Sequence, residues 1–295
     1  MTKRATGSDI RKNKWEILGG QSWSMLTPNR KGLSALPGDI FYTLNMDVNY
    51  QAGLIWSRDP QFRLIYHPTA NVAAGLSIEA PEQYIGGSGG GGVVTLPAAF
   101  QPNNYFNLVN NGTTVFLVPN LHPDFIGKIA WDKAFADGRA MHLEVAGIVR
   151  SFKVYNPNSR RHFGTVAGGG SLNFSFDIVK NLKVLSNNYW SDGGGRWIFG
   201  LAPDLIVRGD GSLSPVHAGS TVSGLEGTWR NTQLFGYYGG VYIGRNVAQD
   251  FVSGAFIPIG YGYSGSPNTQ NRAIQQITGG FIQSSGRIPS TARWL

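Results

Sequence analysis

Residues 141–149 read MHLEVAGIV, and apolar side chains occupy the odd-numbered positions throughout this stretch. The even-numbered positions include His142 and Glu144. Because successive side chains of an extended chain point to opposite sides, this period of two predicts a β-strand with one apolar face and one polar face. The same alternation returns at 72–80 and at 172–178, whereas helical periodicity is scarce. The sequence therefore predicts an all-β fold.

The alternation marks about ten strands along the chain. The second of them contains Asp59 and Pro60, and because proline cannot donate a hydrogen bond to a sheet, we expect a bulge or a loop end there. Its spanning part is then expected at 61–67. The ten predicted strands lie near 14–26, 49–67, 71–80, 123–131, 139–153, 171–179, 183–190, 216–229, 232–243 and 271–284.

The connections between these strands alternate in length. Short turns are predicted at 68–71, 132–138, 180–182 and 230–232, and long Gly/Asn/Pro-rich connections at 27–48, 80–122, 154–168, 191–215 and 244–270. Tight turns at one end and extended loops at the other are typical of outer-membrane barrels. Long structureless loops are uncommon in compact soluble domains. The sequence thus predicts a transmembrane antiparallel β-barrel of the porin kind, incomplete if only these ten strands form it.

Composition favours the same class. Charged residues make up only 14% of the chain, aromatic residues reach 12%, and there are 41 glycines. A wall that faces hydrocarbon carries few charges, and soluble domains usually carry more. No stretch approaches the roughly 20 consecutive apolar residues of a membrane-spanning helix. The absence of cysteine excludes a disulfide scaffold.

The net charge of +8 is concentrated near the start of the chain, where residues 1–14 hold five Lys or Arg and one Asp. No basic run interleaved with aromatic residues follows, so no nucleic-acid partner is predicted. We expect a basic polar tail at 1–13, a barrel region at 14–284 and an atypical C-terminal tail at 285–295.

Several segments resemble Gram-negative outer-membrane porins of the DcaP-like kind. They are Trp15 to Pro28 (WEILGGQSWSMLTP), Pro60 to Pro68 (PQFRLIYHP), Ile78 to Gly87 (IEAPEQYIGG), Val118 to Asp132 (VPNLHPDFIGKIAWD) and Tyr261 to Gln283. The resemblance implies a homotrimer of 16-stranded barrels in the outer membrane, each narrowed by a loop folded into its lumen, and passage of small anionic solutes such as carboxylates. Against that pattern, the chain shows no signal peptide, too few strands and no aromatic-ended last strand, so we expect a fragment truncated at both ends.

The predicted function is passive diffusion of small hydrophilic, anionic solutes through a water-filled channel in contact with outer-membrane lipid, without enzymatic activity, cofactor or metal. By position after the first strand, and by likeness to the porin loop, residues 27–48 are the candidate constriction loop. The candidate constriction and pore-lining residues are Arg30, Lys31, Asp39 and Asp47 in that loop, and Arg63, Lys128, His142, Glu144 and Arg150 on the polar sides of wall strands. The excess of cations among them predicts a modest preference for anions, which Glu at 63 and 150 should lower.

Other classes of protein remain open at this stage. A secreted all-β carbohydrate-binding module would use Trp15, Trp23, Trp56 or Trp190 as stacking platforms. A plugged, structural barrel would share every feature above. Gly86 to Gly90 matches the nucleophile elbow around Ser88, but no helix-forming sequence follows, so an outer loop is favoured. Asp204 and Asp210 could offer oxygen ligands to calcium, although an ordinary turn uses the same residues.

Overall fold

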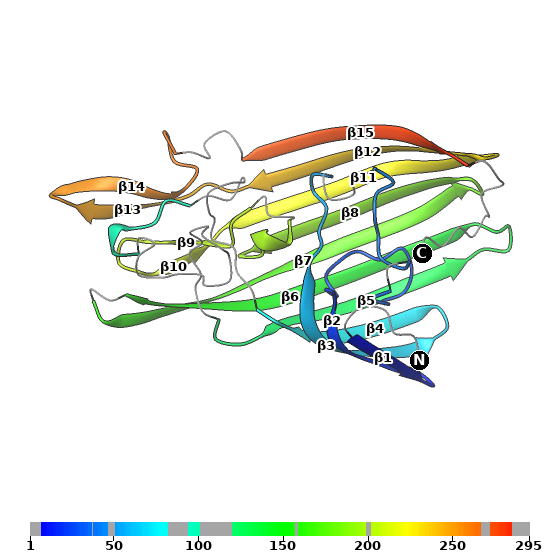
Figure 1. Ribbon diagram of the computed structural model, residues 1–295, viewed down its shortest axis with the longest axis horizontal. Helices are drawn as coiled ribbons and strands as arrows, with labels where there is room; N and C mark the ends of the chain where they lie inside the picture. Colours follow the sequence, from blue (N-terminus) through cyan, green and yellow to red (C-terminus); the bar gives the residue numbers. More distant parts are fainter. Residues whose placement is uncertain are drawn as a thin grey trace.

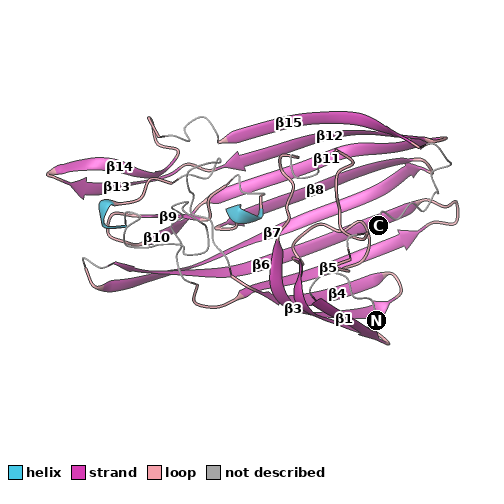
Figure 2. Cartoon of the chain, in the orientation of Figure 1, coloured by secondary structure: helices cyan, strands magenta, loops and turns pink. Residues whose placement is uncertain are grey.

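The computed structural model describes residues 7–36, 38–46, 51–81, 94–100, 120–156, 159–198, 202–266 and 272–284. Its main feature is one 11-stranded antiparallel sheet in which neighbours follow one another along the chain, in the order β1-β2-β3-β4-β5-β6-β7-β8-β11-β12-β15 (Figure 1). Two separate hairpins, β9-β10 and β13-β14, are built from long connections. Apart from two short 3-10 turns, the described chain is strand and loop (Figure 2).

All ten predicted strands are present in the main sheet. They are β2 (Trp15–Trp23), β3 (Arg58–Thr69), β4 (Val72–Glu79), β5 (Asp124–Ala134), β6 (Ala140–Asn156), β7 (Arg161–Val179), β8 (Leu182–Asp192), β11 (His217–Trp229), β12 (Thr232–Ile243) and β15 (Ala273–Gln283). The smaller elements are β1 (Gly7–Lys12), β9 (Leu205–Val207), β10 (Leu213–Pro215), β13 (Asn246–Val252), β14 (Ala255–Tyr261) and the 3-10 turns η2 (Ala98–Phe100) and η4 (Gly195–Trp197).

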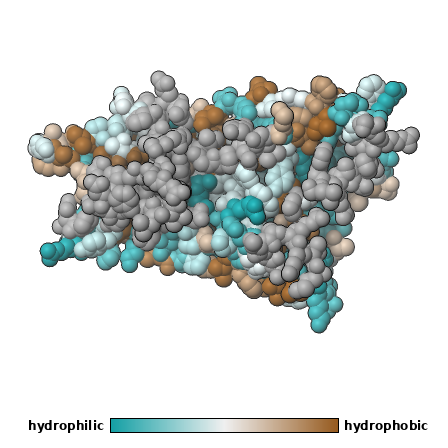
Figure 3. Space-filling model, viewed as in Figure 1, coloured by the Kyte–Doolittle hydropathy of each residue, from teal (hydrophilic) through white to brown (hydrophobic). Residues whose placement is uncertain are grey.

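The sheet has its apolar face outward. Leu76 of β4 is 68% exposed and Ile277 of β15 is 87% exposed, whereas their polar neighbours Ser77 and Gln276 are buried or half-buried. The predicted apolar faces at 72–80, 141–149 and 172–178 all point this way. In the face shown in Figure 3, hydrophilic residues occupy the centre and hydrophobic ones gather at the margins. This distribution is the reverse of a soluble sandwich, which buries its apolar faces.

The predicted basic tail contains a strand. Gly7–Lys12 forms β1 and pairs along its length with β2. Asn13, with φ of 56°, and Lys14 form the two-residue turn between them, and asparagine is among the residues that accept this left-handed conformation readily. Ile10 is exposed on the outer side like the apolar residues of the other strands. Residues 7–12 of the predicted basic tail therefore belong to the main sheet.

Two further predictions differ from the structure. The long connection predicted at 154–168 is a tight one, because β6 and β7 continue to pair as far as Asn156 and Arg161. No interruption occurs at Asp59 and Pro60, which lie inside β3 opposite Ser22 and Gln21. Pro60 still contributes its carbonyl, which accepts a hydrogen bond from the Ala80 amide at 2.8 Å. The alternation of short turns and long connections otherwise holds.

The sheet has two outer strands among the described residues. These are the edge strands β1, which pairs only with β2, and β15, which pairs only with β12. The described part of the chain therefore forms an open sheet, which we call the wall. The predicted atypical tail at 285–295 lies outside the described residues. No helix in the described ranges is long and apolar enough to span a membrane.

Part of the connection between β8 and β11 packs on the inner side of this wall. Trp197 and β9 are completely buried there and form one apolar cluster with wall residues, among them Ile126 of β5 and Ile148 and Phe152 of β6. Inward-facing apolar residues of β5 and β6 are thus covered by loops, while the polar inner residues of the same strands hold the segment described next.

Candidate constriction site

The connection between β2 and β3, residues 24–57, crosses the inner face of the sheet, and we call it the inner segment (Figure 1). Near its start, the Met25 amide donates to Glu79 of β4 at 2.8 Å. Further along, the Leu44 amide donates to the Tyr237 hydroxyl of β12 at 3.1 Å, and the Ala52 amide to Gln276 of β15 at 2.6 Å. The inner segment therefore reaches from the early strands to the last strand of the sheet.

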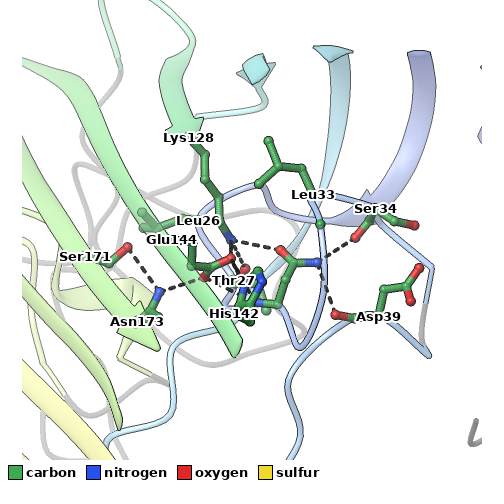
Figure 4. Close-up of polar contacts among 12 residues, drawn as sticks. Leu26, Thr27, Leu33, Ser34, Asp39, Lys128, His142, Glu144, Ser171 and Asn173 are labelled. Carbon is green, nitrogen blue, oxygen red and sulfur yellow. Dashed lines mark hydrogen bonds and ion pairs between the residues drawn. The ribbon is translucent and has the colours of Figure 1, made fainter. Parts of the chain in front are cut away.

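A buried ion pair on the wall holds the first part of this segment. Lys128 of β5 and Glu144 of β6 lie 2.8 Å apart, and neither side chain is exposed. The Lys128 ammonium also donates to the Thr27 carbonyl at 2.8 Å (Figure 4). It donates to Asn29 Oδ1 at 2.8 Å as well. Glu144 accepts the Asn29 amide at 3.2 Å and the side-chain amide of Asn173 at 2.8 Å. Each charge thus has a partner on the wall and a partner on the segment.

His142 extends this network along β6. Its Nδ1 lies 2.9 Å from Asp132 Oδ1, and its Nε2 lies 3.1 Å from Glu144 Oε2. A neutral imidazole can donate from only one nitrogen, so both contacts are donated only by the imidazolium form. Asp132 also accepts the Gly32 amide of the inner segment at 2.9 Å. His142 therefore joins Asp132 and Glu144, the two carboxylates that accept hydrogen bonds from the inner segment.

Arg30 fixes the segment to the opposite part of the sheet. Its guanidinium makes a two-pronged contact with Glu226 of β11, at 2.9 and 2.7 Å, and Glu226 also accepts the Tyr237 hydroxyl at 2.7 Å. Burial acts to lower the pKa of Arg30, but the adjacent Glu226 carboxylate outweighs it and raises this pKa. The Arg30 side chain remains 25% exposed. Arg30 is thus a fully charged group that still borders open space.

Arg63 and Arg150 hold the wall to its loops. Arg63 donates to the carbonyls of Leu33, at 3.0 Å, and Trp23, at 2.6 Å. Arg150 contacts Asp124 of β5 at 3.1 Å, and Asp204 of the β8–β11 connection at 3.1 Å. Asp204, one of the two carboxylates considered as calcium ligands, therefore has an arginine partner.

The predicted site residues fall into two groups. Arg63, Lys128, His142, Glu144 and Arg150 lie on the inner face, but they are at most 3% exposed. They do not present free charge to a lumen, because the inner segment and the β8–β11 connection cover them. In the loop, Lys31 is exposed, Arg30 and Asp39 are half-buried, and Asp47 lies outside the described residues. Glu at 63 or 150 would consequently break buried contacts, in addition to the predicted change of selectivity.

Sequence reasoning missed several residues that complete the site. Asn29, Asp132, Asn173 and Glu226 each contact one of the predicted residues. Asp132 and Asn173 occupy inward-facing positions of their strands, as Lys128 and Glu144 do. The alternation of inward and outward positions along each strand could therefore have identified them. For Asn29 no local pattern distinguishes it from other loop polar residues.

The aromatic residues separate into bands and one inner group. Trp15 and Trp229 lie exposed at the short-turn end of the sheet, and Trp190 and Tyr242 at the end of the long connections. The distance along β11 from the level of Trp190 to Trp229 is about 33 Å, which corresponds to a height of about 25 Å at the usual strand tilt. Trp23 and Trp56 instead stack on each other, with ring centroids 4.8 Å apart.

The inner aromatic group joins the end of β2 to the inner segment. Tyr42 meets the Trp23 ring edge-on, with centroids 5.6 Å apart, and burial raises the pKa of Tyr42 to about 12. The phenol is therefore neutral at physiological pH. Of the four tryptophans considered for carbohydrate stacking, two lie on the outer face and two stack mutually, so they do not form one shared concave patch.

Comparison with known proteins supports the fold. No family model matches the chain, and no curated protein matches it. A solved structure, the outer membrane channel DcaP of Acinetobacter baumannii, is similar with a TM-score of 0.63 and 14% sequence identity. The match covers 96% of this chain and 65% of that one, so the chain spans about 65% of the length of the channel it resembles. The resemblance predicted from the sequence is confirmed, and the chain has the all-β fold of an outer-membrane channel wall.

Proposed function

We propose that this protein forms a channel in a bacterial outer membrane for passive diffusion of small hydrophilic solutes, with the inner segment as its constriction. One observation carries the proposal: the sheet turns apolar residues outward and charged residues inward, and a long segment is bound across the charged face. A wall of this kind is stable where hydrocarbon lies outside and polar groups lie within. The fold shared with an outer-membrane channel supports the same conclusion.

The direct test is electrical. Purified protein reconstituted in a planar bilayer is expected to produce discrete conductance steps, because solutes pass beside the inner segment. Folding and insertion are checked on the same sample by circular dichroism and protease protection. Well-folded, inserted protein that gave no conductance at any voltage would contradict the channel and favour a plugged, structural barrel, in which the inner segment and the apolar cluster close the passage completely.

The outward face gives a second, independent prediction. Replacing Leu76 with Arg is expected to destabilise the protein by about 2–4 kcal/mol in lipid, because the middle of β4 would face hydrocarbon. The matched control is Leu121→Arg, since Leu121 is also exposed but lies in a connection. Unfolding by denaturant in liposomes measures both. Equal and small effects for the two variants would show that the sheet does not face lipid.

The preference for anions is proposed to rest on Lys31 and Arg30, the cations of the inner segment that keep some exposure. Lys31→Glu is expected to lower the anion preference without affecting folding, whereas Lys180→Glu in the short β7–β8 turn should leave it unchanged. The preference should also weaken as salt rises, because the screening length is about 10 Å at about 0.1 M and about 3 Å at about 1 M. Reversal potentials measure both effects. Cation preference in the unmodified pore would refute this assignment.

A further inference from the structure

The outer face carries a groove of about 760 Å³ near the long-connection ends of β8, β11 and β12. Gly219 of β11 is the register partner of Trp190 on one side and of Tyr242 on the other. Residues paired in this way share a face, so two exposed rings stand on either side of a position without a side chain. The Trp190 ring approaches the space above Gly219, where an added Cβ would lie 3.5 Å from it. The groove thus has aromatic walls and a narrow glycine floor.

The floor continues toward the middle of the sheet as a polar row that is satisfied internally. Thr221 donates to Asn188 at 2.9 Å, Asn188 donates to Ser186 at 3.0 Å, and Ser186 and Ser223 share a hydrogen bond of 2.8 Å. Because these groups bond one another, the row does not require a protein partner to satisfy it. Its hydrogen bonds are compatible with an apolar chain lying over it.

The rim of the groove is basic. Arg272 donates to the Tyr242 hydroxyl at 3.2 Å. The Arg272 and Arg245 side chains converge over Gly262, where an added Cβ would lie 3.1 Å from Arg272 Cδ and 3.7 Å from Arg245 Cγ. Within the described ranges, neither arginine forms an ion pair with a carboxylate. The carboxylate at this rim, Asp192, is paired with His217.

We propose that this groove binds an anionic, phosphate-bearing lipid of the surrounding bilayer, for which phosphatidylglycerol serves as the probe. One acyl chain lies between Trp190 and Tyr242, and the phosphate is held by Arg272 and Arg245. Aromatic rings with a polar edge are suited to the membrane interface, and guanidinium groups bind phosphate with directed hydrogen bonds. A second copy related by a twofold axis fits less well, because such a contact would bring like arginine pairs together. The polar row also offers no unmet polar group to any copy of the chain. The inference rests on the proposed function, since a bilayer lipid reaches this face only if the sheet is a membrane wall.

Fluorescence quenching by brominated lipids tests the proposal. The full chain is placed in nanodiscs of phosphatidylcholine with a minor fraction of phosphatidylglycerol, and the bromines are put either on the phosphatidylglycerol chains or on an equal amount of phosphatidylcholine. The signal of Trp190 is the difference between the unmodified protein and Trp190→Phe. Two arginines near a phosphate favour the anionic lipid by about tenfold or more, so brominated phosphatidylglycerol should quench Trp190 far more strongly.

Variants separate the possible outcomes. In the double variant Arg245→Gln with Arg272→Gln, the two brominated lipids should quench Trp190 equally. If the double variant does not fold, Arg245→Gln alone, at an exposed position, should reduce the preference for phosphatidylglycerol. Arg208→Gln, an exposed arginine of the β9–β10 hairpin, is the matched control and should retain it. Equal quenching of Trp190 in the unmodified protein would overturn the lipid site, as would a Trp190 shielded from both lipids while Trp15 is quenched. If neither tryptophan is quenched by either lipid, the membrane wall itself is refuted.

Discussion

Lys128→Met is expected to destabilise the protein by about 3–5 kcal/mol, because it leaves the Glu144 carboxylate buried without its closest cation. The loss extends beyond the ion pair, since the Lys128 ammonium also binds the Thr27 carbonyl and Asn29 of the inner segment. The start of the segment should therefore detach from β5 and β6. Urea unfolding measures the first effect. An increase in single-channel conductance measures the second.

Lys183→Met is the matched control for this variant. Lys183 pairs with Asp177 at 3.7 Å, but its side chain is 30% exposed. Pairs of this kind contribute about 1 kcal/mol or less, so the control should unfold close to the unmodified protein and conduct like it. If Lys128→Met behaved as Lys183→Met does, the buried pair would not anchor the segment.

The strands could be predicted because their signal is local. Alternation over seven or more residues is visible in β4, in β6 and in the last part of β7, and the structure confirms each one. The first part of β7 was missed for two reasons. Residues 161–170 contain four glycines, and the basic and aromatic residues at 161–163 interrupt the alternation. The pairing of this part with β6 is a tertiary contact, which the local sequence does not show. Local composition and long-range pairing thus gave different answers for the same strand.

The candidate site was predictable only as a set of inward positions. Strand parity placed Lys128, His142 and Glu144 on the polar face, and the structure has them there. Their burial could not be read from the sequence, because it depends on where residues 27–32 lie, more than 90 positions away along the chain from Lys128 and further from Glu144. These charges hold the start of the inner segment against β5 and β6, so in the proposed channel passing ions would meet the segment that covers them.

The far end of the inner segment should respond to a single methyl group. At Gly239 of β12, an added Cβ would lie 2.1 Å from the Ala52 carbonyl oxygen and 2.4 Å from Gln51 Nε2. Neither contact can be accommodated without movement, and overpacking of this kind costs about 1–3 kcal/mol. Gly239→Ala is therefore expected to push residues 51–53 off the sheet, lower the unfolding free energy and widen the passage.

Gly236→Ala on the same strand is the matched control, because an added Cβ there meets nothing within 4 Å. Both variants make the same chemical change to the unfolded chain, so its entropy cancels in the comparison. Conductance and urea unfolding should therefore differ between them only through the contact with the inner segment. A Gly239→Ala channel that conducts like Gly236→Ala would place the constriction elsewhere, whereas a larger conductance in Gly239→Ala alone identifies residues 51–53 as part of the narrowest point.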